Sequence, residues 1–195
     1  MAQAAPGAAG FGLGAPAWRQ AGLTALAYVA FGTVALMLAG PPGFASPLYP
    51  PAGVALAATL VVGRSALAGV FLGSILLNAS LGMLRGGDGW AALLWIPALI
   101  GIGAVLQAQL GAWLVRRAVA MPLVLSEPRD IARAGLLGGF VACTVSASVG
   151  TAALGIGGVL EPDDVFPNWA TWWLGDTLGV LITAPLVLTL IGQPR

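Results

Sequence analysis

Six apolar runs, separated by short polar or proline-rich breaks, constrain this 195-residue chain more than any other feature. They cover residues 23–39, 52–62, 65–84, 90–115, 134–153 and 168–191. Only 8 % of the residues are charged and 58 % are hydrophobic, so the chain lacks the polar surface that a soluble domain requires. The sequence therefore predicts an all-α, multi-pass transmembrane helical bundle of about six spans.

The second run is unusual because it is short. At 1.5 Å per residue, residues 52–62 reach across only about half of a ~30 Å hydrocarbon core. Either the run extends back through residues 47–49, or this proline-rich segment dips into the membrane where protein or water covers its backbone. Two later prolines predict irregular helices, with a kink at Pro97 in the fourth run and an interruption at Pro185 in the sixth.

The positions of the arginines predict the orientation of the bundle. With an even number of spans and the N-terminus inside, seven of the eight arginines fall on the cytoplasmic side: Arg19, Arg64, Arg116, Arg117, Arg129, Arg133 and Arg195. The positive-inside rule expects this asymmetry, so both termini are predicted to be cytoplasmic. Residues 1–17 form an Ala/Gly/Pro tail that we predict to be disordered, ahead of an integral-membrane domain over residues 18–195.

Several residue types are missing, and their absence limits the chemistry. The chain has no His and no Lys, which excludes imidazole-based metal sites, His-dependent nucleophilic catalysis and Schiff-base mechanisms. A single cysteine, Cys143, permits neither an internal disulfide nor an iron–sulfur cluster. We therefore expect no enzymatic activity, cofactor, metal site or nucleic-acid partner, and the arginines are expected to meet membrane lipids.

One acidic residue, Asp176, falls inside a predicted span. A charge at mid-helix costs at least about 2.5–3.5 kcal/mol on insertion scales, so this side chain should face the bundle interior. It is either a ligand contact or proton site, or a helix–helix hydrogen bond that fixes packing. By residue count, Asn78 and hydroxyls of the fifth run, Thr144 and either Ser146 or Ser148, reach a similar depth in the outer half. The same count places Gln107 deeper, with a separate partner.

Aromatic residues and pairs of glycines are the other conspicuous features of the apolar runs. Trp172 and Trp173 form either an interfacial aromatic belt or a wall over a ligand, together with Tyr49. Three glycine pairs with a spacing of four residues predict closely packed helices. These pairs are Gly69/Gly73, Gly135/Gly139 and Gly175/Gly179.

Two stretches resemble the first family of membrane-associated sensor (MASE) domains, which are integral-membrane sensory domains of bacterial signalling proteins. One is the sequence Tyr-Pro-Pro-Ala-Gly at 49–53, followed by Gly-Val-Phe-Leu-Gly-Ser at 69–74 and by Asn78. The other is Trp-Trp-Leu-Gly-Asp-Thr-Leu-Gly at 172–179, followed by Pro185. The resemblance covers roughly residues 20–191. Candidate ligand-binding residues are Asp176, Asn78, Ser74, Thr144, Trp172, Trp173 and Tyr49.

The resemblance implies a sensory input module in the bacterial inner membrane. Such a module detects a small-molecule ligand or a membrane state and acts on a C-terminal output domain, either a histidine kinase or a cyclic-di-GMP enzyme. Family members often have about eight spans, whereas six are counted here, so the chain is either cut before further helices or a short family member. A homodimer is expected. The alternative is a small transporter or substrate-binding membrane subunit, which also fits an intramembrane acid and a short span.

Overall fold

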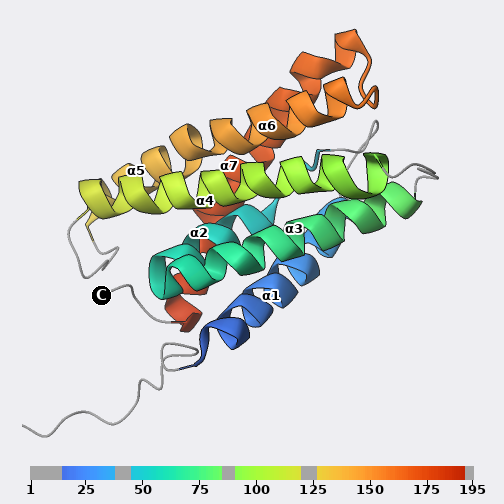
Figure 1. Cartoon of the computed structure of the whole chain (residues 1–195). Coiled ribbons are helices and arrows are strands. Elements are labelled where there is room, and N and C mark those ends of the chain that lie inside the picture. Colours follow the sequence, from blue (N-terminus) through green and yellow to red (C-terminus); the bar gives the residue numbers. More distant parts are fainter. Residues whose placement is uncertain (1–14, 38–44, 85–90, 120–126, 192–195) are drawn as a thin grey trace, which may run out of the picture.

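The computed structural model describes residues 15–37, 45–84, 91–119 and 127–191, and these form an all-helical bundle (Figure 1). The first three helices are α1 (Ala17–Met37), α2 (Pro50–Val62) and α3 (Arg64–Leu84). A π-helical turn, η1 (Ala91–Trp95), leads into α4 (Ile96–Ala118). The next helix is built from α5 (Pro128–Ala134), a π-helical segment η2 (Gly135–Val141) and α6 (Ala142–Ile156). A 3₁₀ turn, η3 (Pro162–Asp164), precedes the last helix, α7 (Val165–Ile191).

Five helices are long and apolar enough to cross a membrane, and the predicted bundle of about six spans is confirmed with one short member. That member is α2, whose 13 residues match the second predicted run. It is preceded by residues 45–49, which are not helical and lie inside the bundle. Ser46 in this segment donates a 2.9 Å hydrogen bond to the Ala35 carbonyl near the end of α1, so the segment and α2 run back along α1.

The helices alternate in direction, which the contacts between them establish. Ser65 at the start of α3 donates a hydrogen bond to Gln20 near the start of α1, so α1 and α3 run parallel. On the neighbouring helices, Arg116 near the end of α4 donates to carbonyl oxygens near the end of α2. The first residues of α1 and the last of α7 therefore lie at the same end of the bundle, at the lower left of Figure 1.

The short helix α2 occupies the centre of the bundle. It packs most extensively against α7 and also contacts α1, α3 and α4. All ten residues from Pro51 to Leu60 are buried. A helix that is apolar on every side is stable only when other helices surround it, and α2 meets that condition.

Prolines and π-helical segments account for the irregular parts of the long helices. Pro97 lies in the first turn of α4, directly after η1, so the predicted kink coincides with a π-helical turn. Pro185 does not interrupt its span as predicted, because it lies inside the continuous helix α7. In η2, the carbonyl of Phe140 accepts a 2.9 Å hydrogen bond from the indole nitrogen of Trp173 on α7. A neighbouring helix thus supplies a partner for a π-helical backbone group.

The described arginines gather at one end of the bundle, together with Glu127 and Asp130 at the start of α5. Six arginines of the described segments lie at the end where α1 begins: Arg19, Arg64, Arg116, Arg117, Arg129 and Arg133. Glu161, Asp163 and Asp164 lie at the opposite end, between α6 and α7. Arg85, Asp88 and Arg195 lie outside the described residues. The cytoplasmic location of the arginine-bearing end stays a prediction from the positive-inside rule.

The predicted N-terminal boundary needs a small correction. Helix α1 begins at Ala17, inside the tail that was predicted to be disordered and six residues before the apolar run at Leu23. Trp18 and Arg19 therefore belong to the first helical turn, because polar and aromatic residues continue a helix through the interface. Residues 1–14 lie outside the described part of the chain, and their predicted disorder stays a prediction.

Candidate functional site

Asp176 lies in the middle of α7 and faces the bundle interior. It is the twelfth of the 27 residues of the helix, and only 2 % of its surface is exposed. Three side chains place hydrogen-bonding groups around its carboxyl: Ser146 from α6, Gln107 from α4, and Trp172 from the preceding turn of α7. The acid is therefore held at a junction of three helices and is shielded from both lipid and bulk water.

The polar groups of this junction are incompletely paired within the described segments. Asp176 Oδ1, Gln107 Oε1 and Thr177 Oγ1 are buried without a hydrogen-bond partner there. No arginine of these segments forms a salt bridge with Asp176. A buried polar group without a hydrogen-bond partner destabilises the fold by about 1–3 kcal/mol. A donor or a cation that pairs with Asp176 removes this cost, so its binding free energy is more favourable here than at a site whose groups are already paired.

An extended segment, residues 45–49, crosses α7 beside Asp176. The amide of Tyr49 donates a 3.0 Å hydrogen bond to the carbonyl of Gly175. A Cβ atom at Gly175 would collide with the carbonyl oxygen of Ser46, and one at Gly179 with that of Tyr49. The predicted close approach at the 175/179 pair is thus confirmed, although its partner is an extended chain as well as a helix. The two glycines allow the extended segment to bring Tyr49 to the acid.

A small cavity adjoins Asp176 on this side. It has a volume of about 20 Å³ and is lined by Leu36, Ala45, Ser46, Tyr49, Leu77, Asn78, Trp172 and Asp176. A cavity needs about 10–15 Å³ of such volume to hold one water molecule. In this arrangement of the helices, the cavity therefore admits a water-sized occupant. An organic ligand would require residues 45–49 to move away from α7.

The two tyrosines of the chain meet next to this cavity. Tyr49 OH donates a long hydrogen bond of 3.4 Å to Tyr28 OH, and the rings pack edge to face at 6.2 Å. The Tyr28 hydroxyl also interacts with Ser74 on α3. Asn78 Nδ2 in turn donates to the Ser74 carbonyl at 2.9 Å. A polar chain therefore leads from α1 through α3 to the cavity.

The structure brings together most, but not all, of the predicted site residues. Asp176, Asn78, Tyr49 and Trp172 line the cavity, and the buried Ser74 supports Asn78 from behind. Thr144 is directed elsewhere, because its hydroxyl donates to the Val141 carbonyl in the preceding turn. The fifth run contributes Ser146 to Asp176 instead, since that residue faces α4 and α7.

Trp172 and Trp173, for which an interfacial belt and a wall over a ligand were the alternatives, have different surroundings in the structure. Trp172 is 9 % exposed and packs against Gly150 of α6, so it forms a wall of the site. Trp173 and Trp169 stack on each other with 9° between their rings. Trp169 Nε1 donates to Ser148 and Trp173 Nε1 to Phe140, both outside the cavity. Trp169 and Trp173 therefore stack outside the cavity lining and bond α6 and η2, whereas Trp172 lines the cavity with Asp176.

Sequence reasoning misplaced Gln107 and did not identify Tyr28. Gln107 was expected deeper than Asp176, but it is the twelfth of the 23 residues of α4 and meets Asp176 at the same level. The error arose because α7 begins at Val165, three residues earlier than predicted, which lowers Asp176 toward mid-membrane. The amide nitrogen of Gln107 also donates to Cys143 at 3.3 Å. Spacing along the chain gives no signal for Tyr28, which reaches the site through the packing of α1 on α3.

Comparison with known proteins agrees with this architecture. No match was found among curated proteins or among solved structures. The MASE1 family model matches residues 19–195, which is nearly the whole chain and includes every helix that surrounds Asp176. The chain therefore belongs to the MASE1 family of membrane-associated sensory domains.

Proposed function

We propose that this chain is the sensory input domain of a bacterial signalling protein and that the junction around Asp176 is its sensing site. The ligand or membrane state that it detects changes the contacts of Asp176, and α7 carries the change to a C-terminal output domain. That domain is a histidine kinase or a cyclic-di-GMP enzyme, and the chain itself performs no catalysis. The observation that carries this proposal is a buried, incompletely paired carboxyl on α7 of a sensory-family bundle.

The incomplete pairing favours a switch over a purely structural contact. A signal can shift an equilibrium between two helix arrangements only by interacting differently with each of them. An occupant that donates to Asp176 Oδ1 would stabilise the arrangement in which that oxygen is accessible to it. A saturated helix–helix hydrogen bond would leave no atom for such an occupant, whereas Oδ1 is unpartnered within the described segments.

The extended segment 45–49 provides a way to transmit the change. It is fixed to α7 by the Tyr49–Gly175 hydrogen bond and continues directly into α2, which packs along α7. A ligand larger than the cavity must separate this segment from α7. Such a movement would alter the packing of α2 on the C-terminal half of α7. Pro185 lies in that half, and α7 lacks one backbone hydrogen bond there.

The test compares substitutions of Asp176 in the full gene product, including whatever follows codon 195. Asp176→Asn keeps the shape of the side chain but cannot carry a charge, and Asp176→Leu removes its polar atoms. We expect both variants to remain folded and to lose at least tenfold of the signal response, measured as kinase or cyclase output. Asn168→Leu is the matched control, because Asn168 is a buried polar residue of α7 that bonds Thr151 away from the cavity.

Two results would contradict the proposal. One is an unchanged response in a folded Asp176→Asn protein, which would leave the carboxyl a packing role. The other is a reading frame that closes after codon 195 together with uptake of a solute by vesicles containing the protein, which would favour the transporter alternative. A signalling domain encoded after codon 195 supports the sensory role.

A further inference from the structure

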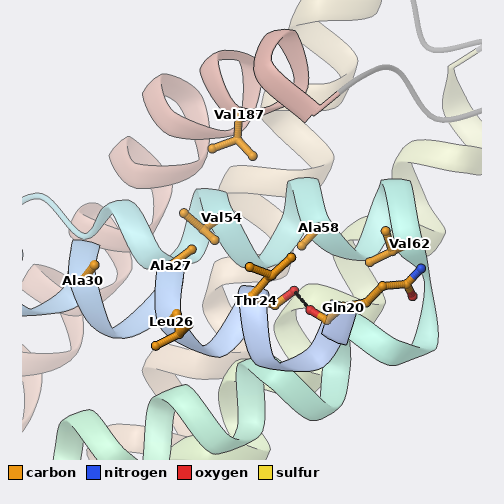
Figure 2. Close-up of a pocket in the computed structure, with 10 residues that line it drawn as sticks. Gln20, Thr24, Leu26, Ala27, Ala30, Val54, Ala58, Val62 and Val187 are labelled. Atoms are coloured by element: carbon orange, nitrogen blue, oxygen red, sulfur yellow. Dashed lines mark hydrogen bonds between the residues drawn. The ribbon is translucent and has the colours of Figure 1, made fainter. Parts of the chain in front are cut away.

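A second hollow lies between α1, α2 and α7, away from the Asp176 cavity (Figure 2). Its volume is about 420 Å³, and its lining is almost entirely apolar. Val54, Ala58 and Val62 of α2 form one side, with Val187 of α7 beyond them. The α1 side consists of Gln20, Leu23, Thr24, Leu26, Ala27 and Ala30. We refer to these ten residues as the α1–α2 groove.

The length of the groove corresponds to one leaflet of a bilayer. It extends along α1 from Gln20 to Ala30, a rise of about 15 Å at 1.5 Å per residue. Half of a ~30 Å hydrocarbon core is the same length. The groove starts at the end of the bundle where the arginines lie and reaches the middle of the membrane. Its dimensions therefore suit a single extended hydrocarbon chain.

The polar end of the groove carries uncompensated positive charge. Gln20 and Val62 mark this end, and the Ser65–Gln20 hydrogen bond holds the starts of α3 and α1 together. Arg19 and Arg64, the residues just before this bonded pair, are both exposed and form no salt bridge within the described segments. Two exposed cations at the mouth of an apolar groove are complementary to a negatively charged headgroup with an acyl chain.

We propose that the α1–α2 groove binds one acyl chain of an anionic phospholipid, whose headgroup lies between Arg19 and Arg64. The small side chains of Ala27, Ala30 and Ala58 leave the space for the chain, and Thr24 keeps its hydroxyl on the Gln20 carbonyl at 2.8 Å. The site borders α7, the helix that carries Asp176, and α2, which directly follows residues 45–49. Its existence does not depend on the role proposed for Asp176.

Lipid retention measures this site directly. The full-length protein is reconstituted into vesicles of phosphatidylglycerol and phosphatidylcholine in equal amounts and with identical acyl chains, extracted in mild detergent, and examined by native mass spectrometry. We expect one retained lipid per chain, with phosphatidylglycerol favoured at least fivefold. Ala27→Phe fills the groove and should reduce retention at least tenfold. Ala30→Phe, at an exposed position of the same groove, is the second variant in case Ala27→Phe does not fold. Ala152→Phe, at an exposed alanine on α6 outside the groove, is the matched control and should leave retention unchanged.

The charge requirement is tested separately. The double variant Arg19→Gln/Arg64→Gln should bind both lipids equally, since each basic residue near the surface contributes about fivefold to the binding of anionic lipid. Arg129→Gln, at an exposed arginine on α5, should leave the preference unchanged. Equal retention by wild type and a folded groove-filling variant would overturn the proposal. So would an absent preference for phosphatidylglycerol, or a lipid-free dimer in which a second copy covers the groove.

Discussion

At the scale of single residues, three glycines decide how close α7 can come to its neighbours. A Cβ at Gly53 of α2 would collide with the Gly179 carbonyl, and Cβ atoms at Gly175 and Gly179 would collide with the backbone of residues 46–49. Lipid provides no hydrophobic force between helices, so such close backbone approach supplies the packing that holds them together. Gly175 and Gly179 let the non-helical residues 46–49 lie against α7, and Gly53 lets α2 do the same.

Gly179→Ala should therefore destabilise the protein. The added methyl group meets the carbonyl oxygen of Tyr49, which is backbone and cannot turn aside. Overpacking of this kind costs about 1–3 kcal/mol. The measurement is the free energy of unfolding in mixed detergent micelles, followed by tryptophan fluorescence.

Gly155→Ala is the matched control, because a Cβ there meets no atom within 4 Å. It should be neutral or stabilise α6 by up to about 1 kcal/mol through helix propensity. Equal destabilisation by the two substitutions would show that the close contact at Gly179 does not matter.

At the scale of elements, the short helix α2 needs a partner for its last carbonyl groups. The last four carbonyls of a helix accept no hydrogen bond within it. At the end of α2, Thr59 O accepts one from the Gly63 amide at 3.1 Å and Val62 O one from the Ser65 hydroxyl at 3.1 Å. Arg116 of α4 donates to two of them, at 2.8 Å from Thr59 O and 3.0 Å from Leu60 O. Arg116 was expected to meet lipid headgroups, but the structure shows it joining α4 to α2.

Arg116→Gln should loosen the end of α2. Hydrogen bonds from a charged donor contribute about 1.5–3 kcal/mol, and exposure of the Arg116 side chain reduces this to about 1 kcal/mol. Amide hydrogen exchange should become faster in residues 59–63, and the thermal midpoint in detergent should fall. Arg129→Gln, an exposed arginine on α5, serves as the control and should change neither quantity. Unchanged exchange in α2 would contradict the capping role.

At the scale of the whole molecule, an even number of chain passages places both described ends on one side. The same side carries all six described arginines, and the opposite side carries the acidic residues of the α6–α7 connection. Such separation is what the positive-inside rule produces when a bundle inserts. It predicts which face of the protein meets the cytoplasm.

Cysteine labelling in intact cells checks this orientation. A membrane-impermeant maleimide should label Glu161→Cys from outside, and should label Arg129→Cys only after the membrane is permeabilised. The native Cys143 is buried and should remain unlabelled in both backgrounds, which makes it an internal control for folding. The opposite pattern would mean that the bundle is inserted the other way round.

The sequence predicted the bundle and the number of passages correctly because apolar length and the spacing of charges act locally along the chain. Asp176, Asn78, Tyr49 and Trp172 were proposed as site residues because polar or aromatic residues inside apolar runs are conspicuous, and these four line one cavity in the structure. The same reasoning failed for Gln107, since the depth of a residue depends on where each helix starts. Thr144 was proposed in place of Ser146, which lies next to Asp176 in the structure, because the rotation of their helix is fixed by its neighbours.

Sequence alone therefore determined that the chain lies in a membrane, that it is helical and where its six apolar runs are, since each follows from the hydropathy of consecutive residues. Tertiary structure alone decided that α2 lies at the centre, that Tyr28 and Gln107 join the site, and that Arg116 caps a neighbouring helix. These features depend on which side chains from distant segments meet. In a membrane, that choice rests on steric fit between small residues and on a few buried hydrogen bonds, neither of which leaves a periodic signal in one helix.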